Sequence, residues 1–176
     1  MVGYRNTLEV LVESPELPCG EHVWCGAIAA HANGDLIKVN GCYMHRLNVD
    51  CQVVVERKLP VDQAHNGLLI LSDGSIVIKD LRLAGQGAST VTRLDPKMLE
   101  LIGEVLVLPD GSMGRIASDL RPDGEFIYIP GIEYVWRVLV KPKTLAIDWD
   151  WSPKYRSEPG TMACHGMAAY LTMRSG

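Results

Sequence analysis

The sequence predicts an all-β protein assembled from a repeated unit of about 40 to 50 residues, each unit being a four-stranded antiparallel sheet. Three observations support this fold class. Asn-Gly or Asp-Gly turns recur between short apolar runs, an arginine recurs in a later apolar run, and a proline closes each unit. The three landmarks keep the same order along the chain, which indicates repetition of one structural unit.

The turns are the first landmark. The stretches AIAAHANGDLIKV, LLILSDGSIVIKD and RIASDLRPDGEFIYI each place two apolar runs around a turn, at Asn33-Gly34, Asp73-Gly74 and Asp123-Gly124. Asn-Gly and Asp-Gly between apolar runs are the strongest short-range signal for a β-hairpin. Each stretch is therefore predicted to be the first hairpin of a unit.

An arginine and a proline follow each hairpin. The arginines lie in the runs YMHRLNVD, TVTRLDPK and YVWRVLVK, at Arg46, Arg93 and Arg137, 47 and 44 residues apart. Because the position repeats, the predicted role is bracing within or between units. The prolines are expected just past a strand's last pairing residue, because proline lacks the N–H that a sheet ladder needs. Pro60, Pro109 and Pro153 follow the three hairpins, and Pro18 closes the strand before the first one; the four are 42, 49 and 44 residues apart.

Four short strands at this period are typical of a blade of a β-propeller. The stretch DPKMLELIGEVL is the one helix-like candidate, and its continuation into VLVLP favours a strand. An immunoglobulin-like sandwich also has many short strands, but it does not repeat three landmarks in fixed order. We therefore expect propeller-type blades.

The landmarks divide residues 1–176, taken as a single propeller-like domain, into blades and single strands. The predicted ranges are 7–18 for the outer strand of a preceding blade, 26–60, 66–109 and 113–153 for three complete blades, and 167–173 for the first strand of a further blade. Three blades form an incomplete ring, because propellers have about four to eight. The expectation is a homo-oligomer, with a dimer favoured; domain-swapped strands and a fragment of a longer propeller are the alternatives.

Composition narrows the choice of partners. Of the 176 residues 47% are hydrophobic, which allows a sizeable core, and the net charge is −4. This balance offers no basic patch for phosphates, so nucleic acid is not an expected partner. The sequence has no apolar stretch long enough for a bilayer and no signal peptide, so no membrane partner is expected and the expected location is the cytoplasm. Five cysteines without a Cys-x-x-Cys spacing suit a reducing compartment.

The Asp-Gly hairpins, the run RLDPKMLELIGEVLVLPDG after them and the run DWDWSPKYRSEPG together resemble the six-bladed propeller superfamily of gluconolactonases, strictosidine-synthase-like proteins and NHL-type repeats. The resemblance covers most of residues 7–176 and implies part of a propeller, about three blades with a single strand at each end. It also implies a ligand site at one end of the central channel. In the gluconolactonase branch, this site would hold a divalent metal ion through Glu, Asn and Asp oxygens and would take a lactone or similar ester.

The fold predicts which loops face the channel mouth: those leading from a fourth strand into the next first strand, and those between second and third strands. Three of the four leading loops carry a histidine, at His22, His65 and His165, and the other carries Arg115. Neutral imidazoles that converge on the axis would bind a transition metal, as a divalent ion. The alternative is that these histidines are solvated or bonded to neighbouring turns.

Further candidates lie in the loops between second and third strands. Arg82 and Gln86, in DLRLAGQGAST, are candidate ligand-binding residues together with Arg115. Glu133, in PGIEYVW, is a candidate general base, and His165 is a second candidate for a catalytic role. The alternative for Glu133 is a solvated turn residue. Three tryptophans are expected to pack within a blade: Trp136, Trp149 and Trp151.

Two functions of different class follow. The first is a metal-dependent hydrolase of a lactone or ester, with water activated by a cation at the channel mouth. The second is a non-catalytic propeller segment that binds a small molecule or a protein through its loops and self-associates. A set of ligands converging on equivalent loops distinguishes the two, and in the sequence only the histidines come close to it.

Overall fold

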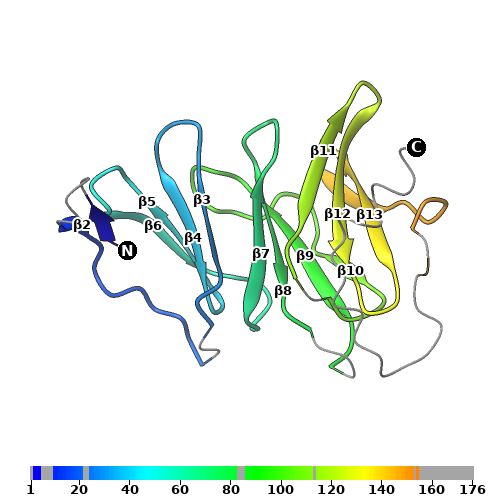
Figure 1. Ribbon diagram of the computed structural model, residues 1–176, viewed down its shortest axis with the longest axis horizontal. Coiled ribbons are helices and arrows are strands. Elements are labelled where there is room, and N and C mark those ends of the chain that lie inside the picture. The colour runs from blue at the N-terminus through cyan, green and yellow to red at the C-terminus, as the bar shows by residue number, and fades with distance from the viewer. Residues whose placement is uncertain are drawn as a thin grey trace.

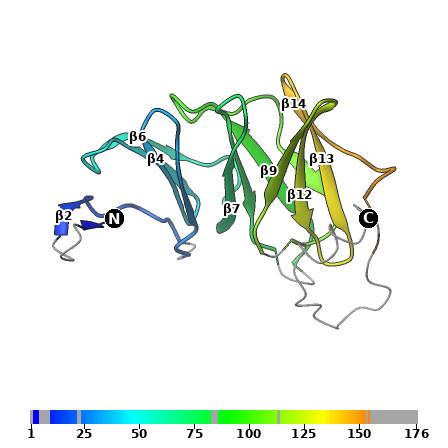
Figure 2. The same ribbon diagram turned by 45° about the horizontal axis from the view of Figure 1, so that its top comes forward.

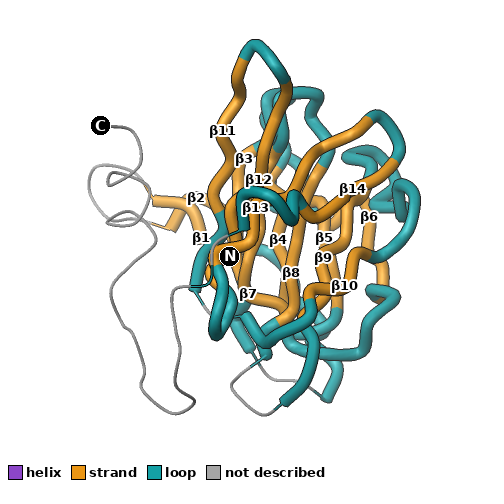
Figure 3. The backbone as a smooth tube through the Cα atoms, turned by 90° about the vertical axis from the view of Figure 1, so that its right-hand side faces the viewer, coloured by secondary structure: helices purple, strands orange, loops and turns teal. Residues whose placement is uncertain are grey.

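The computed structural model describes residues 2–4, 10–21, 24–82, 86–112, 114–152 and 154. These residues form three four-stranded antiparallel sheets and one two-stranded sheet (Figure 1), and none of them lies in a helix (Figure 3). The prediction of an all-β protein with blade-like sheets is confirmed. Across the same ranges there is no helix that could span a membrane.

Each four-stranded sheet uses its strands in sequence order, and we call the sheets blade 1, blade 2 and blade 3. Blade 1 consists of β3 (Ala27–Ala30), β4 (Leu36–Asn40), β5 (Tyr43–Leu47) and β6 (Val53–Lys58). Blade 2 consists of β7 (His65–Ile70), β8 (Ile76–Asp80), β9 (Ser89–Leu94) and β10 (Leu106–Leu108). Blade 3 consists of β11 (Ala117–Arg121), β12 (Gly124–Pro130), β13 (Val135–Lys141) and β14 (Thr144–Ile147). Each strand therefore pairs with its neighbour in the sequence.

The predicted turns join the first and second strands of the three blades. Gly34, Gly74 and Gly124 have φ angles of 91°, 83° and 141°. Residues with a Cβ rarely adopt such angles, which explains the glycine at each turn. In blade 1 the His31 N–H donates to the carbonyl oxygen of Asp35 at 2.8 Å and closes the turn. The hairpins thus form where the dipeptides predict them.

The connection from β9 to β10 differs from the expectation. The sequence favours a strand from residue 95 onward, but β10 spans only Leu106–Leu108. The Asp95 carboxylate is the cause. It accepts hydrogen bonds at 2.9 Å from three backbone N–H groups, those of Lys97, Met98 and Glu100. An aspartate that satisfies nearby N–H groups competes with a sheet ladder, so the chain folds into a compact turn here.

The strands outside the three blades have a separate arrangement. β1 (Val2–Tyr4) and β2 (Val10–Glu13) pair with each other in the two-stranded sheet. β2 lies within residues 7–18, and the sheet to which it belongs has β1 as its other member. The strand predicted at 167–173 lies outside the described residues.

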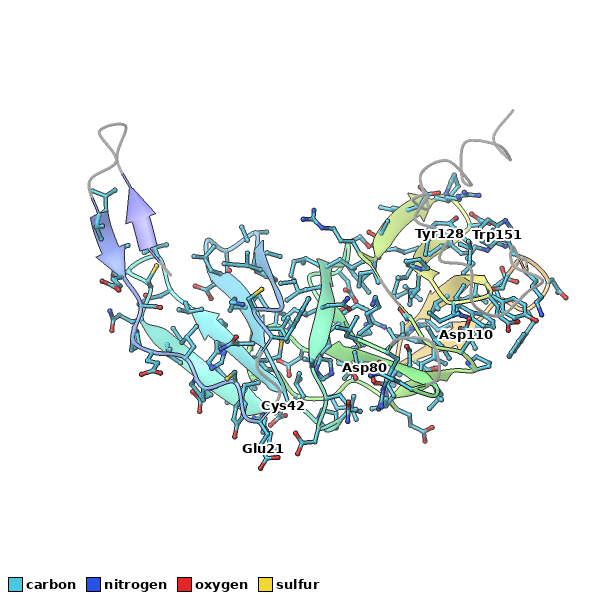
Figure 4. All side chains as sticks on the ribbon, turned by 60° about the horizontal axis from the view of Figure 1, so that its bottom comes forward. Glu21, Cys42, Asp80, Asp110, Tyr128 and Trp151 are labelled. Carbon is cyan, nitrogen blue, oxygen red and sulfur yellow. The ribbon has the colours of Figure 1, made fainter. Side chains whose placement is uncertain are left out.

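The blades pack face to face and follow one another along an open arc (Figures 2 and 4). Every residue of β8 is buried, because successive side chains point to opposite faces and both faces of blade 2 are covered. The core between blades 1 and 2 consists of Ile37, Val39, Met44, Leu59, Ile76, Ile78, Leu94 and Leu99. The core between blades 2 and 3 consists of Leu71, Val77, Val91, Leu108, Ile127, Ile129, Trp136, Val138 and Leu145.

Two arginines at the repeated position brace neighbouring blades, as their spacing predicts. Arg46 in β5 donates from Nε to Asp35 Oδ2 at 2.7 Å. Its Nη1 donates to the carbonyl oxygen of Lys97 in blade 2 at 2.5 Å. Arg93 in β9 likewise donates from Nη1 to the carbonyl oxygen of Lys141 in blade 3 at 2.6 Å. Because a guanidinium presents its N–H groups as a planar fork, one side chain bonds its own blade and the next.

We expect Arg93→Met to lower the free energy of unfolding by about 3 kcal/mol, because the buried Ser75 hydroxyl loses its partner and the hydrogen bond to the Lys141 carbonyl of the next blade is lost. Only 3% of this side chain is exposed, and it also donates from Nε to Ser75 Oγ at 2.8 Å. Urea denaturation followed by circular dichroism measures the change. Arg121→Met is the matched control, since 46% of the Arg121 side chain is exposed and an exposed pair contributes less than about 1 kcal/mol. Equal losses in the two variants would contradict the bracing role.

Candidate functional site

The loops that the sequence places at the channel mouth do meet between blades 2 and 3. Arg82, in the loop after β8, exchanges backbone hydrogen bonds of 3.2 and 2.9 Å with Ser112, in the loop after β10. Ser112 also forms a β-bridge with Gly131, in the loop after β12. The Ile132 N–H donates to the carbonyl oxygen of Gly111 at 2.9 Å. Three separate loops are thus tied into one surface.

Arg82 is the counter-ion of a buried carboxylate. Its Nε donates to Asp80 Oδ2 at 2.8 Å, and 22% of the Arg82 side chain is exposed, whereas Asp80 has no exposed surface. The other Asp80 oxygen accepts from the Thr90 N–H at 2.7 Å. The predicted ligand-binding residues Gln86 and Arg115 occupy exposed positions in neighbouring loops. Of the three predicted ligand-binding residues, Arg82 has an observed contact with a charge: its guanidinium neutralises the buried Asp80 carboxylate.

Glu133 lies beside a second aspartate at the same end of blade 3. Asp110 Oδ2 accepts from the Glu133 N–H at 2.8 Å, and Asp110 Oδ1 accepts from Trp136 Nε1 at 2.5 Å. The Glu133 carboxylate forms an ion pair of 2.6 Å with Lys154 Nζ. This hydrogen bond raises the pKa of Lys154 and keeps the ammonium charged. In this arrangement the Glu133 carboxylate is paired with the Lys154 ammonium, and its role as a general base stays a prediction.

His65 is the predicted metal ligand that the structure describes; His22 and His165 lie outside the described residues. The His65 ring is 1% exposed, and Nδ1 donates to the carbonyl oxygen of Gly41 at 3.2 Å. Nε2 is buried and has no hydrogen-bond partner in the described structure. Burial lowers the pKa of His65, so the ring is neutral near pH 7. Among the described residues, no group of three or more His, Cys, Asp or Glu is placed to hold a metal ion.

A buried lysine lies in blade 2, on the face that is turned toward blade 3. Lys79 in β8 has no exposed surface, and its Nζ donates to Asn66 Oδ1 at 2.6 Å. Gly67 makes room for it, because a Cβ at that position would lie 2.7 Å from Lys79 Cγ and 3.2 Å from Ile116 Cγ2. Burial lowers the pKa of Lys79 to about 8, against the opposing effect of Asp80. The alternation in SIVIKD, which puts Lys79 on the face of Val77, is the signal that could have predicted this burial.

An aromatic corner stands at the edge of blade 3; we define it as Glu133, Tyr134, Trp136, Trp149 and Lys154. Trp136 is 1% exposed and stacks on Tyr134 with ring centroids 4.6 Å apart. Trp149 meets Trp136 edge to face, at 5.5 Å and 85°. Trp149 is 64% exposed, although the sequence suggests packing for all three tryptophans of this region. The Lys154 ammonium lies 5.7 Å from the centre of the Tyr134 ring.

A groove of about 280 Å³ runs between blade 1 and the β9–β10 connection. Its apolar floor continues the core between blades 1 and 2, and an ion pair of 3.3 Å between Arg57 and Glu100 spans it. The lining residues are Arg57, Lys58, Leu59, Pro60, Leu94, Leu99, Glu100 and Leu101. None of the predicted site residues is among them.

Comparison with known proteins supports the fold. No protein-family model and no curated protein matches this sequence. The chain is similar to the crystal structure of a protein of unknown function from Bacteroides caccae, with a TM-score of 0.54 and 17% sequence identity. The similarity covers 85% of this chain and 51% of the other, so this chain spans about half the length of that protein. A likeness at this identity concerns the fold alone. The fold therefore defines an all-β protein with propeller-like blades.

The metal centre expected on His22, His65 and His165 stays a prediction. If it exists, protein purified in the presence of Zn²⁺, Mn²⁺ or Ni²⁺ retains one ion per chain. His65→Ala should lose that ion, because Nε2 of the neutral ring has no hydrogen-bond partner in the described structure. Elemental analysis of the desalted protein measures this. His31→Ala is the matched control, because His31 binds Asn33 and the carbonyl of Gly74. Protein without metal in all three preparations would contradict the centre.

We expect stability to rise with pH between about 8 and 10.5, because the unfolded chain binds a proton at Lys79 that the folded chain has released. The folded pKa is about 8 and the ordinary value is 10.5, so the gain is about 3 kcal/mol across the interval. Urea denaturation at several pH values, for the natural chain and for Lys79→Met, isolates this contribution from other titrations. Parallel pH profiles for the two proteins would contradict the assignment.

Proposed function

We propose that the chain is a non-catalytic binding module whose ligand site is the aromatic corner and whose ligand is a sugar. The observation that carries the proposal is the 64% exposure of Trp149 on top of the buried Trp136. A large ring left in water forgoes the free energy that its burial would provide, so a fixed and exposed ring favours contact with a ligand. The edge-to-face contact with Trp136 holds the ring in one orientation before binding, which reduces the entropy lost on association.

The groups beside Trp149 favour an amphipathic ligand. The ion pair of Glu133 and Lys154 borders the aromatic rings, with side chains 39% and 48% exposed. A purely apolar ligand would remove water from these charges without replacing its hydrogen bonds, which is costly. A sugar ring presents C–H groups on a face and hydroxyls around its edge, so it can stack on the indole and bond the carboxylate and ammonium. Its chemistry therefore matches both parts of the corner.

The state of the charged groups supports binding rather than catalysis. Glu133 is paired with Lys154, and Arg82 is paired with the buried Asp80. Hydrolysis requires a carboxylate or imidazole that is available to move a proton, with a reacting atom within hydrogen-bond reach. The Glu133–Lys154 pair can still exchange hydrogen bonds with the hydroxyls of a sugar. The metal-dependent hydrolase predicted from the sequence would depend on His22 and His165 in addition to His65.

We expect Trp149→Ala to weaken sugar binding at least about ten-fold, because the stacking surface is removed. The probes are soluble α-glucan, β-glucan and xylan, each titrated separately and followed by isothermal calorimetry and tryptophan fluorescence. Trp24→Ala is the matched control, since Trp24 is also exposed, at 43%, but lies outside the aromatic corner. Failure of all three glycans to bind the natural chain, or equal losses in the two variants, would overturn the proposal.

A further inference from the structure

The bracing position occurs a third time, at the end of the arc. Arg46, Arg93 and Arg137 stand opposite Ile37, Val77 and Tyr128, which are residues of the second strand in each blade. The first two arginines point toward the next blade along the chain. Arg137 holds the same register position in blade 3, on the face turned away from blade 2, because its neighbours Trp136 and Val138 belong to the core between blades 2 and 3. The third brace therefore faces the position of a further blade.

The two internal braces follow one positional rule. Arg46 donates to the carbonyl oxygen of Lys97, which lies four residues after Arg93. Arg93 donates to the carbonyl oxygen of Lys141, which lies four residues after Arg137. Each bracing arginine thus reaches the carbonyl that comes four residues after the bracing arginine of the next blade. Blade 1 carries the same carbonyl at Asp50, four residues after Arg46.

Arg137 is positioned like the others but has no further blade to bond among the described residues. Its Nε donates to Asp148 Oδ2 at 2.7 Å, and its Nη2 bonds the same oxygen. The guanidinium carbon lies 4.9 Å from the centre of the Phe126 ring and 4.8 Å from that of Trp151. Figure 4 shows Tyr128 and Trp151 together at this end of the arc. In the described structure no hydrogen bond involves Nη1, the atom that bridges blades in the other two braces.

We propose that Arg137 Nη1 donates to the carbonyl oxygen of Asp50 in a second copy of this chain. Blade 3 of one copy then stands beside blade 1 of the other. The same contact forms again between the remaining ends, so a two-fold axis relates two identical joints. Two copies contribute three blades each, and six blades lie within the range of closed propellers.

Three observations favour a second copy as the occupant of this face. The chain spans about half the length of the structurally similar Bacteroides caccae protein, so two copies supply a comparable amount of chain. Asp50 brings a negative charge to a carbonyl that must accept from Arg137, whereas the internal acceptors belong to Lys97 and Lys141. Val49, beside Asp50, is 70% exposed, and Ile28 on the same end blade is 50% exposed. Apolar side chains left in water at the outer blade favour coverage by a partner.

The test is a charge exchange at the two ends of the chain. We expect the full natural chain to be a dimer by sedimentation equilibrium. Asp50→Arg places like charges at both joints, and so does Arg137→Glu; each should raise the dimer dissociation constant at least about ten-fold. In an equimolar mixture of the two variants, one joint has native side chains and the other has the exchanged pair, so the dimer should return. This rescue distinguishes a contact between copies from a loss of folding.

Controls keep the outcomes separate. Lys58→Glu reverses an exposed charge that pairs with Asp62 on the outer strand of blade 1, and it should leave the dimer unchanged. Circular dichroism reports whether each variant folds; if Arg137→Glu does not fold, Asp50→Arg, in an exposed turn, remains the deciding variant. A natural chain that is monomeric at about 100 µM would overturn the proposal, because Arg137 would then be satisfied within one chain. A dimer that tolerates Asp50→Arg would overturn it as well.

Discussion

The seam between neighbouring blades is the constraint on which the rest of the structure depends. A sheet with two apolar faces is stable only when both are covered, and β8 satisfies this by sending Ile76 and Ile78 to one core and Val77 to the other. Apolar contact alone is not directional and would let the sheets slide. The guanidinium of Arg93 removes that freedom, because it must reach a single carbonyl oxygen on blade 3. Burial of apolar side chains provides the driving force for packing, and the Arg93 guanidinium sets how blade 2 is aligned with blade 3.

Blade 3 is where the chain departs most from its own repeat. In blades 1 and 2 the Nε of the bracing arginine bonds a residue of the first hairpin, Asp35 or Ser75. In blade 3 it bonds Asp148, beyond β14, and this brings the segment DWDW against the sheet. The hydrogen bond between Arg137 and Asp148 therefore fixes the segment that carries Trp149 and Trp151. Departures from a repeated pattern that cost regularity without improving packing are expected at functional positions, which is consistent with the ligand site proposed at Trp149.

Much of the fold follows from local sequence, because glycine turns and a repeated arginine each have one dominant structural use. Gly34, Gly74 and Gly124 mark three hairpins, and the period of the arginines indicates the braces. The loop at Asp95 could not be predicted this way, since its carboxylate competes with the strand that VLVLP favours. The exposure of Trp149 depends on how blade 3 turns after β14, a tertiary feature that composition does not report.

The site residues were harder to predict than the fold for a related reason. The sequence of a loop does not indicate whether its histidine or glutamate is free or paired. The structure shows that Glu133 forms an ion pair with Lys154 and that Arg82 forms one with Asp80. Pairing of this kind depends on neighbours from other loops, such as Asp110 beside Glu133. Spacing along the chain carries no information about it. For Glu133 and Arg82, the partners that the structure shows come from contacts within and between loops rather than from spacing along the chain.

The two faces of blade 3 allow the proposed ligand binding and the proposed self-association to coexist. Trp151 lies against Tyr128, on the face that carries Arg137, with ring centroids 5.2 Å apart. Trp149 lies against Trp136, whose ring belongs to the opposite face and to the core with blade 2. A partner that covers the Arg137 face therefore leaves the aromatic corner open. A two-fold dimer would then present two such corners on one rigid body. For a polymeric ligand, the second contact becomes intramolecular, and two weak sites gain avidity without any change in the chemistry of either.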